Sequence, residues 1–156
     1  MSKVKRIMIS LTVLFSMTLV SACNEVEDDW TIVNDDEKVS ELVDFMTDYK
    51  AHWEESLQTG SFSSVEPYFV SNSQVYHMER RQHQEISSRR EVERFIGYED
   101  LNIKINSHGE YRISWKESVE VAGMSEQAKV NRNRSYTINE RNDSSYRIIS
   151  VEREDD

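Results

Sequence analysis

The chain has 156 residues with 29 acidic and 19 basic side chains, so its formal net charge is −10. That length suits a single domain, and the excess of negative charge argues against binding nucleic acid, whose phosphates it repels. The single cysteine excludes an intramolecular disulfide and a cysteine-rich zinc site. The four histidines lack metal-binding spacing and the four glycines form no phosphate-binding loop, so we expect neither a metal nor a cofactor.

The first 22 residues have the three parts of a secretory signal peptide. Lys3, Lys5 and Arg6 are followed by a 14-residue, mainly apolar run, Ile7–Val20, and then by small residues. The run is shorter than the roughly 20 residues that a membrane-spanning helix needs. Because this leader holds three of the basic residues and no acidic one, the rest of the chain has a formal charge of −13.

The leader ends in Val20-Ser21-Ala22-Cys23, which resembles the lipobox of bacterial lipoproteins. The resemblance implies cleavage between Ala22 and Cys23 and a diacylglyceryl group, with palmitate as a typical acyl chain, on the Cys23 sulfur. Two acyl chains suffice for stable anchoring, so we expect a protein anchored on the extracytoplasmic face of the cell membrane. The alternative is an ordinary signal peptide with a cysteine near its cleavage site by chance.

The segment Asn24–Asp36 is acidic and has no clear helical or strand period, so we expect a tether there. Its Trp30–Val33 stretch is the exception. Those residues either dock on the domain or form a short edge strand, and the sequence leaves both open.

The clearest predicted element is a helix over about Asp36–Gln58. Its apolar side chains recur three and four positions apart, as on one face of a helix. They are Val39, Leu42, Met46, Tyr49, Trp53 and Leu57, with Val43 and Phe45 widening the stripe. Asn34 and Glu37 resemble a capping box at its start, and Gly60 suits the left-handed turn that ends a helix.

Two shorter helical segments follow. Ser61–Val70 contains the only proline and predicts a brief helix. A third helix is expected from Ser71–Ser73 to about Ser87. Its weaker stripe consists of Val75, Met78, Gln82 and Ile86. The nearby arginines Arg80, Arg81, Arg89, Arg90 and Arg94 have local partners available in Glu79, Glu85, Glu91 and Glu93.

Four strands are expected after the helices. They are Phe95–Ile105, Tyr111–Val121, Glu126–Glu140 and Ser145–Glu152, joined by short turns. Gly97 marks an expected bulge. The second strand alternates most cleanly between apolar and polar positions, and in the third Arg132 and Arg134 lie on the same side as Tyr136.

Segregated helices and strands indicate an α+β domain, with about three helices packed on a curved antiparallel sheet of about four strands. Such a sheet curls into a cone with a pocket between it and the long helix. We place this domain at residues 36–152, after a lipidated Cys23 and tether at 23–35 and before a charged tail at 153–156.

Four short segments carry a family resemblance. They are FMTDY at Phe45–Tyr49, WEESLQTGSF at Trp53–Phe62, VEPYF at Val65–Phe69 and FIGYE at Phe95–Glu99. Together they resemble the C-terminal domain of TcaA-type membrane proteins of Firmicutes. The resemblance spans about Asp36–Val151 and implies the nuclear-transport-factor-two-like cone fold, shared with ketosteroid isomerase and SnoaL-type proteins. It also implies an envelope setting linked with responses to cell-wall-acting antibiotics, and no particular reaction. TcaA-type proteins usually carry a zinc ribbon and a transmembrane helix before their outer domains, and a lipobox stands in their place here.

The candidate pocket residues give no catalytic constellation. They are Tyr49, His52, Trp53, Tyr68, Tyr98 and Trp115. Isomerases of the cone fold need a carboxylate base facing a proton donor in a dry pocket. Asp48 lies opposite the apolar stripe, which argues against a place in the pocket. His52 either lines the mouth of the pocket or is a partly buried structural histidine. We therefore assign no catalytic residue.

Arg132 and Arg134 are candidate anion contacts, for teichoic acid, a lipid head group or an acidic partner. The alternative is a solvated face on which local glutamates neutralise them.

The sequence therefore predicts a non-enzymatic, lipid-anchored envelope protein that binds an unidentified envelope protein, a cell-wall polymer or a small ligand, in cell-wall or envelope-stress processes. One alternative is a small enzyme of the SnoaL or ketosteroid-isomerase type that uses the helix–sheet pocket, and another is a structural subunit of a membrane complex. A large pocket lined by an ionisable pair would favour the enzyme. A pocket filled by Trp53, Tyr49 and Trp115 would favour a binding or structural module.

Overall fold

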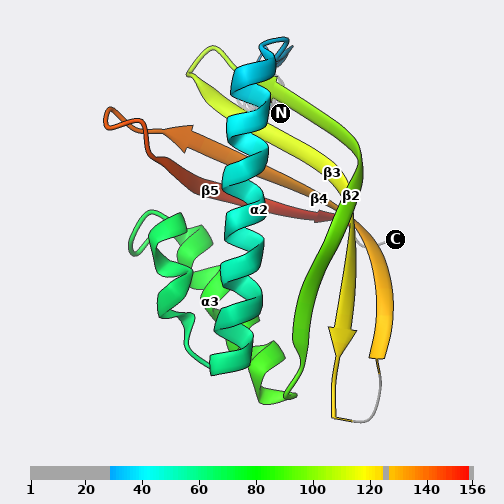
Figure 1. Cartoon of the computed structure of the whole chain (residues 1–156). Coiled ribbons are helices and arrows are strands. Elements are labelled where there is room, and N and C mark those ends of the chain that lie inside the picture. Colours follow the sequence, from blue (N-terminus) through cyan, green and yellow to red (C-terminus); the bar gives the residue numbers. More distant parts are fainter. Residues whose placement is uncertain (1–28, 125–126, 155–156) are drawn as a thin grey trace, which may run out of the picture.

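The computed structural model describes residues 29–124 and 127–154, so the signal peptide, Cys23 and the first part of the tether lie outside the described residues. Figure 1 shows the long helix α2 crossing the concave face of a curved sheet, with α3 beside its C-terminal half. The five strands are antiparallel and lie in the order β1-β2-β3-β4-β5. The elements are β1 (Thr31–Ile32), α2 (Asp36–Thr59), the 3-10 turns η1 (Phe62–Ser64) and η2 (Glu66–Tyr68), α3 (Gln74–Ser88), β2 (Val92–Ile105), β3 (Glu110–Ala122), β4 (Gln127–Glu140) and β5 (Tyr146–Glu154). The predicted α+β cone is confirmed.

Helix α2 begins and ends close to where the sequence predicts, but with a different cap. The Asp35 carboxylate accepts hydrogen bonds from the backbone N–H groups of Glu37 and Lys38, at 3.0 and 3.2 Å. Asp35, and not the expected Asn34, is therefore the N-cap residue. Gly60 ends the helix with φ of 71°, a conformation that glycine adopts without a steric penalty.

The buried face of α3 differs from the predicted stripe. Val75 and Ile86 are buried as expected, but Met78 is exposed and the buried positions between them are Glu79 and His83. Glu79 faces Arg153 of β5 as its ion-pair partner. The rule that apolar residues mark the inner face fails here because a strand distant in sequence supplies a charge that an isolated helix pattern does not show.

The sheet extends beyond the predicted domain at both ends. Thr31 and Ile32 of the expected tether pair with Ile105 and Lys104 as strand β1. Trp30 also docks on the domain, since the Arg112 guanidinium lies 4.2 Å from its ring centre. At the other end, β5 continues to Glu154, which incorporates half of the expected charged tail into the sheet. Among the described residues, no helix is long and apolar enough to cross a membrane.

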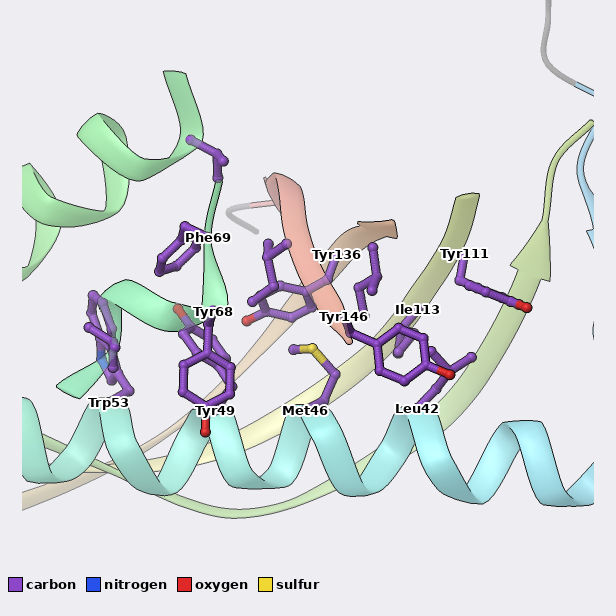
Figure 2. Close-up of a cluster of buried hydrophobic side chains, with 14 of the residues drawn as sticks. Leu42, Met46, Tyr49, Trp53, Tyr68, Phe69, Tyr111, Ile113, Tyr136 and Tyr146 are labelled. Carbon is purple, nitrogen blue, oxygen red and sulfur yellow. The ribbon is translucent and has the colours of Figure 1, made fainter. Parts of the chain in front are cut away.

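The core lies between α2 and the concave face of the sheet. Figure 2 shows Leu42, Met46 and Tyr49 pointing from successive turns of α2 toward the strands, where Ile113 and Tyr136 meet them. The predicted bulge in β2 is present as a register shift between Phe95 and Gly97. Burial of these large side chains supplies the main driving force for packing the helix on the sheet.

Candidate functional site

A buried cluster of charges lies between α2 and the sheet. We call Lys50, Glu93, Glu117 and Arg132 the interior network. Glu117 is its centre and is 0% exposed. One carboxylate oxygen of Glu117 lies 2.6 Å from Lys50 Nζ, and the other lies 2.7 Å from Arg132 Nε. Two cations from different elements therefore neutralise one buried carboxylate.

The second carboxylate of the network is held in the same way. Arg132 donates to both oxygens of Glu93, at 2.8 and 3.1 Å, and the Trp53 indole N–H donates to one of them at 3.1 Å. Lys50 also donates to the Tyr136 hydroxyl at 2.6 Å. Pairing and hydrogen bonding offset the free-energy cost of removing these charges from water. Removing one member leaves its partner buried and unpaired, which destabilises the fold.

The local sequence explains how these residues meet. Glu117 and Arg132 are direct partners across β3 and β4, so both point to the concave face. Glu93 lies on the neighbouring strand β2, and Lys50 lies four positions after Met46 on the inner face of α2. Three strands and one helix each contribute one charge to the same point.

The network holds its carboxylates ionised. Burial alone would raise the pKa of Glu117, but the charges of Lys50 and Arg132 outweigh it and lower the pKa to about 2. Burial opposes ionisation of Glu93 as well, and hydrogen bonding to Arg132 lowers its pKa below the ordinary value. For Lys50, burial would lower the pKa, and the Glu117 charge raises it instead. Burial raises the pKa of Tyr136 to about 12, so its hydroxyl stays protonated.

The space left between helix and sheet is small. The interior cavity measures about 30 Å³. It is lined by Tyr49, Lys50, Trp53, Glu79, Gln82, Glu93, Arg132, Arg134, Tyr136, Val151 and Arg153. This volume suits one or two water molecules and no organic substrate, because a site for a small ligand typically measures at least about 300 Å³.

The structure does not bring the six expected pocket residues together in one pocket. Tyr49 and Trp53 line the interior cavity. Trp115 is buried beside it, stacked between Phe95 and the half-exposed Tyr98 at ring-centre distances of 5.6 and 5.0 Å. His52 and Tyr68, the other two candidates, instead line a second hollow beside α2.

We call this second hollow the outer cavity, which has a volume of about 570 Å³. It is lined by Glu41, Phe45, Asp48, His52, Ser64, Pro67, Tyr68, Ser144, Ser145, Tyr146 and Arg147. Three segments meet there: the edge of α2 beside its buried stripe, the η1–η2 region, and the turn between β4 and β5 with the start of β5.

A hydrogen-bonded trio of side chains lies in the outer cavity. The Tyr68 hydroxyl donates to the Asp48 carboxylate. His52 Nδ1 lies 2.9 Å from the Asp48 carbonyl oxygen and 2.8 Å from the Tyr68 hydroxyl. Burial and the neighbouring Asp48 carboxylate together raise the pKa of Tyr68. The side chains of Asp48 and His52 remain 63% and 38% exposed, so solutes have access to them.

The two candidate anion contacts have different surroundings. Arg132 is committed to Glu93 and Glu117 within the interior network. Arg134 is buried, donates to the Asn133 carbonyl oxygen at 2.8 Å and lies 4.0 Å from Glu117. Neither is the solvent-exposed cation that a polymer would meet first.

Sequence reasoning missed Lys50 and Glu117 altogether and assigned Glu79 and Glu93 to local arginines. The expected pairing between arginines and glutamates close in the sequence is found at Arg89, which binds Glu85 and Glu91 at 2.8 and 2.9 Å. The signal that was available is strand parity, because position 117 falls on the same side of its strand as the buried Ile113 and Trp115. In the described part of the chain, no group of three or more histidine, cysteine, aspartate or glutamate side chains is arranged to hold a metal ion.

Comparison with known proteins agrees with this architecture. The family model for the TcaA protein NTF2-like domain matches residues 38–152. A curated relative, an uncharacterized protein of Alkalihalophilus pseudofirmus, is 24% identical over 139 residues, which cover 89% of this chain and 90% of that protein. The matched range includes α3 and strands β2 to β4 in full, together with most of α2 and of β5. The chain therefore belongs to the TcaA NTF2-like domain family.

Proposed function

We propose that this protein is a non-enzymatic binding or accessory module of the cell envelope, anchored on the extracytoplasmic face of the membrane through a lipid on Cys23. The observation that carries the proposal is the small size of the cavity inside the cone. In the region where an enzyme of this fold would hold substrate, the cavity measures about 30 Å³ and is lined by paired charges.

The chemistry of the interior supports a structural role for it. Isomerase-type catalysis needs a carboxylate that can take up a proton from a substrate and a second group that can donate one. Here Glu93 and Glu117 are both neutralised by Arg132, and Lys50 adds a second cation to Glu117. Ion pairs of this kind hold the helix on the sheet and keep these two carboxylates from acting as a free base.

The proposed anchor follows from the sequence around Cys23. Because Trp30 contacts Arg112 and β1 begins at Thr31, a connecting segment of only six residues, 24–29, separates Cys23 from the folded part. Fully extended, it reaches at most about 20 Å. The domain would then work close to the membrane surface, although its acidic body is repelled by anionic lipid.

Replacing the anchoring residue tests the location. We expect Cys23→Ser to abolish labelling with a fatty-acid analogue and to release the protein from the membrane fraction, because no acyl chain remains to hold it. The matched control is Ser21→Ala, which keeps a small residue in the lipobox and retains both labelling and attachment. Unchanged membrane retention and lipid labelling of Cys23→Ser would refute the anchor.

Crosslinking in intact cells tests the binding role. The full-length protein, captured after crosslinking, should bring down a reproducible envelope component that depends on surface residues of the domain. A component whose assembly fails without this protein would favour the structural-subunit alternative. Turnover of a small substrate by the purified protein would contradict the proposal.

A further inference from the structure

We propose that the outer cavity binds a small ligand through an ammonium group. This inference rests on the proposed role as a binding module and names the chemical class that the module would recognise. Three properties of the cavity carry it: its size, its aromatic walls and its excess of hydrogen-bond acceptors.

The outer cavity has the dimensions of a ligand site. Its volume of about 570 Å³ falls in the range of roughly 300–1,000 Å³ that is usual for small-molecule sites. Its walls come from α2, from the η1–η2 region and from the turn that follows β4. Rigid elements therefore fix two walls, and two of the lining side chains, Tyr68 and Tyr146, belong to the buried cluster drawn in Figure 2.

Three aromatic rings form one side of the cavity. Phe45 is the middle ring, with its centre 5.5 Å from that of Tyr68 and 5.4 Å from that of Tyr146. Both tyrosines are buried and Phe45 is half-buried, so Phe45 is the most accessible of the three rings. The Lys38 ammonium group lies 5.4 Å from the centre of the Tyr146 ring, so that ring already contacts a cation. Ring faces attract ammonium groups, and a set of several rings is the arrangement that recognises them best.

The polar groups beside these rings mostly accept hydrogen bonds. The Asp48 carboxylate carries a full negative charge and accepts from Tyr68. A backbone carbonyl oxygen can only accept, so in the 2.9 Å contact His52 Nδ1 donates to the Asp48 carbonyl oxygen. An ammonium group has only donors and therefore complements this set.

The available carboxylate at the cavity is that of Asp48. Glu41 and Asp48 supply two negative charges and Arg147 supplies one positive charge, and Lys38 adds a second positive charge 2.8 Å from Glu41. These local charges balance, and Lys38 occupies Glu41, which leaves Asp48 as the carboxylate that a cation can approach. Arg147 is occupied in part, because it donates to the Tyr146 carbonyl oxygen at 2.6 Å. The acidic body of the protein adds a field of the same sign as the Asp48 carboxylate.

Titration with two simple probes tests the proposal. Choline chloride and ethylamine hydrochloride would be added to the isotopically labelled full-length protein in detergent micelles, with sodium chloride as the matched salt control. We expect chemical-shift changes that saturate and map to Asp48, His52 and Tyr68, with Kd on the order of 1 mM for such small probes. Stronger binding of choline would identify a quaternary ammonium ligand, and stronger binding of ethylamine a primary one.

Two variants make the test specific to the cavity. Asp48→Asn should weaken probe binding about tenfold, because it removes the charge that faces the ammonium group. Asp44→Asn, an exposed position on α2 that does not line the cavity, is the control and should bind as the parent does. Equal binding by Asp48→Asn, or shifts no larger than those with sodium chloride, would overturn the inference. Either result would leave the Cys23→Ser test of the anchor untouched.

Discussion

The interior network and the outer cavity lie on opposite sides of one helix. Both contain charged side chains, which are buried in the first and exposed in the second. Lys50 and Asp48 are two positions apart on α2, so one points into the sheet and the other away from it. Inside, Lys50 and its partners are buried and each carboxylate has a cation at 2.6–2.8 Å. Outside, Asp48 is mostly exposed and has hydrogen-bonding capacity to spare. Burial therefore commits the charges of the interior network to the fold, and exposure leaves the Asp48 carboxylate accessible to solutes.

The largest effect on stability is expected when the centre of the interior network is removed. Glu117→Gln leaves the buried Lys50 without its carboxylate partner and removes one of the two carboxylates that Arg132 binds. We expect the free energy of unfolding to fall by about 3–5 kcal/mol, the usual cost of breaking a buried ion pair from one side. Urea denaturation followed by circular dichroism measures this loss.

The control for Glu117→Gln is Glu99→Gln, since Glu99 is an exposed glutamate on β2. A surface substitution of this kind should change the unfolding free energy by less than about 0.5 kcal/mol. If Glu117→Gln costs no more than Glu99→Gln, the network does not stabilise the fold and the account of the interior is wrong.

Arg153→Met tests whether the ion pair between Arg153 and Glu79 stabilises the fold as the interior network does. Arg153 pairs with Glu79, which is 2% exposed, but Arg153 itself is partly exposed. We expect a loss of about 2–3 kcal/mol, below that of Glu117→Gln because water screens one partner. Thermal unfolding in parallel with Arg141→Met, an exposed turn position, provides the comparison. A loss no greater than that of Arg141→Met would confine the network to its four central residues.

In the outer cavity, Tyr68→Phe tests how much the hydroxyl group contributes to stability, because it removes the hydroxyl and keeps the ring. The hydroxyl bonds to both Asp48 and His52. Since both partners can turn to water, we expect the unfolding free energy to fall by only about 1 kcal/mol. A loss as large as that of Glu117→Gln in the same denaturation experiment would show that the outer trio belongs to the core.

The smallest effect is expected for the variant that matters most to ligand binding. Asp48→Asn keeps the size of the side chain and alters an exposed group, so stability should change by less than about 0.5 kcal/mol. A matched melting temperature of the variant and the parent would show that its loss of probe binding comes from the cavity. A shift of several degrees would place Asp48 among the residues that hold the fold.

Much of the fold could be read from the sequence because local patterns dictate it. The spacing of Leu42, Met46, Tyr49 and Trp53 fixes the inner face of α2, and the predicted limits of that helix differ from the observed ones by one residue. The alternation in β3 likewise fixes which side chains face the helix. Strand β1 was left open, because two residues paired with a distant strand have no pattern of their own.

The interior network was not predicted, and the reason is physical. A charged residue such as Glu117 is usually assigned to solvent, and only its tertiary partners make its burial tolerable. Those partners lie on β4 and α2, so no spacing in the sequence reveals them. The same holds for Glu79 and Glu93, whose true partners are Arg153 and Arg132.

The pH dependence of stability follows from the same network. Glu117 has its ordinary pKa of 4.5 in the unfolded chain and a pKa of about 2 in the folded one. Its contribution to stability is therefore complete above about pH 4.5 and is lost as the pH falls toward 2. Glu93, whose pKa is also lowered, adds to the loss in the same direction.

Carboxyl-carbon NMR titration of Glu117 tests most directly whether the interior is a closed structural network. The account predicts that the carboxylate stays ionised down to a pKa of about 2, with Lys50 and Arg132 as its partners. The exposed Glu99, followed in the same spectra, is the internal reference. A pKa of Glu117 above 4.5 would contradict the account, because a carboxyl group that keeps its proton in the interior is what an acid–base active site requires.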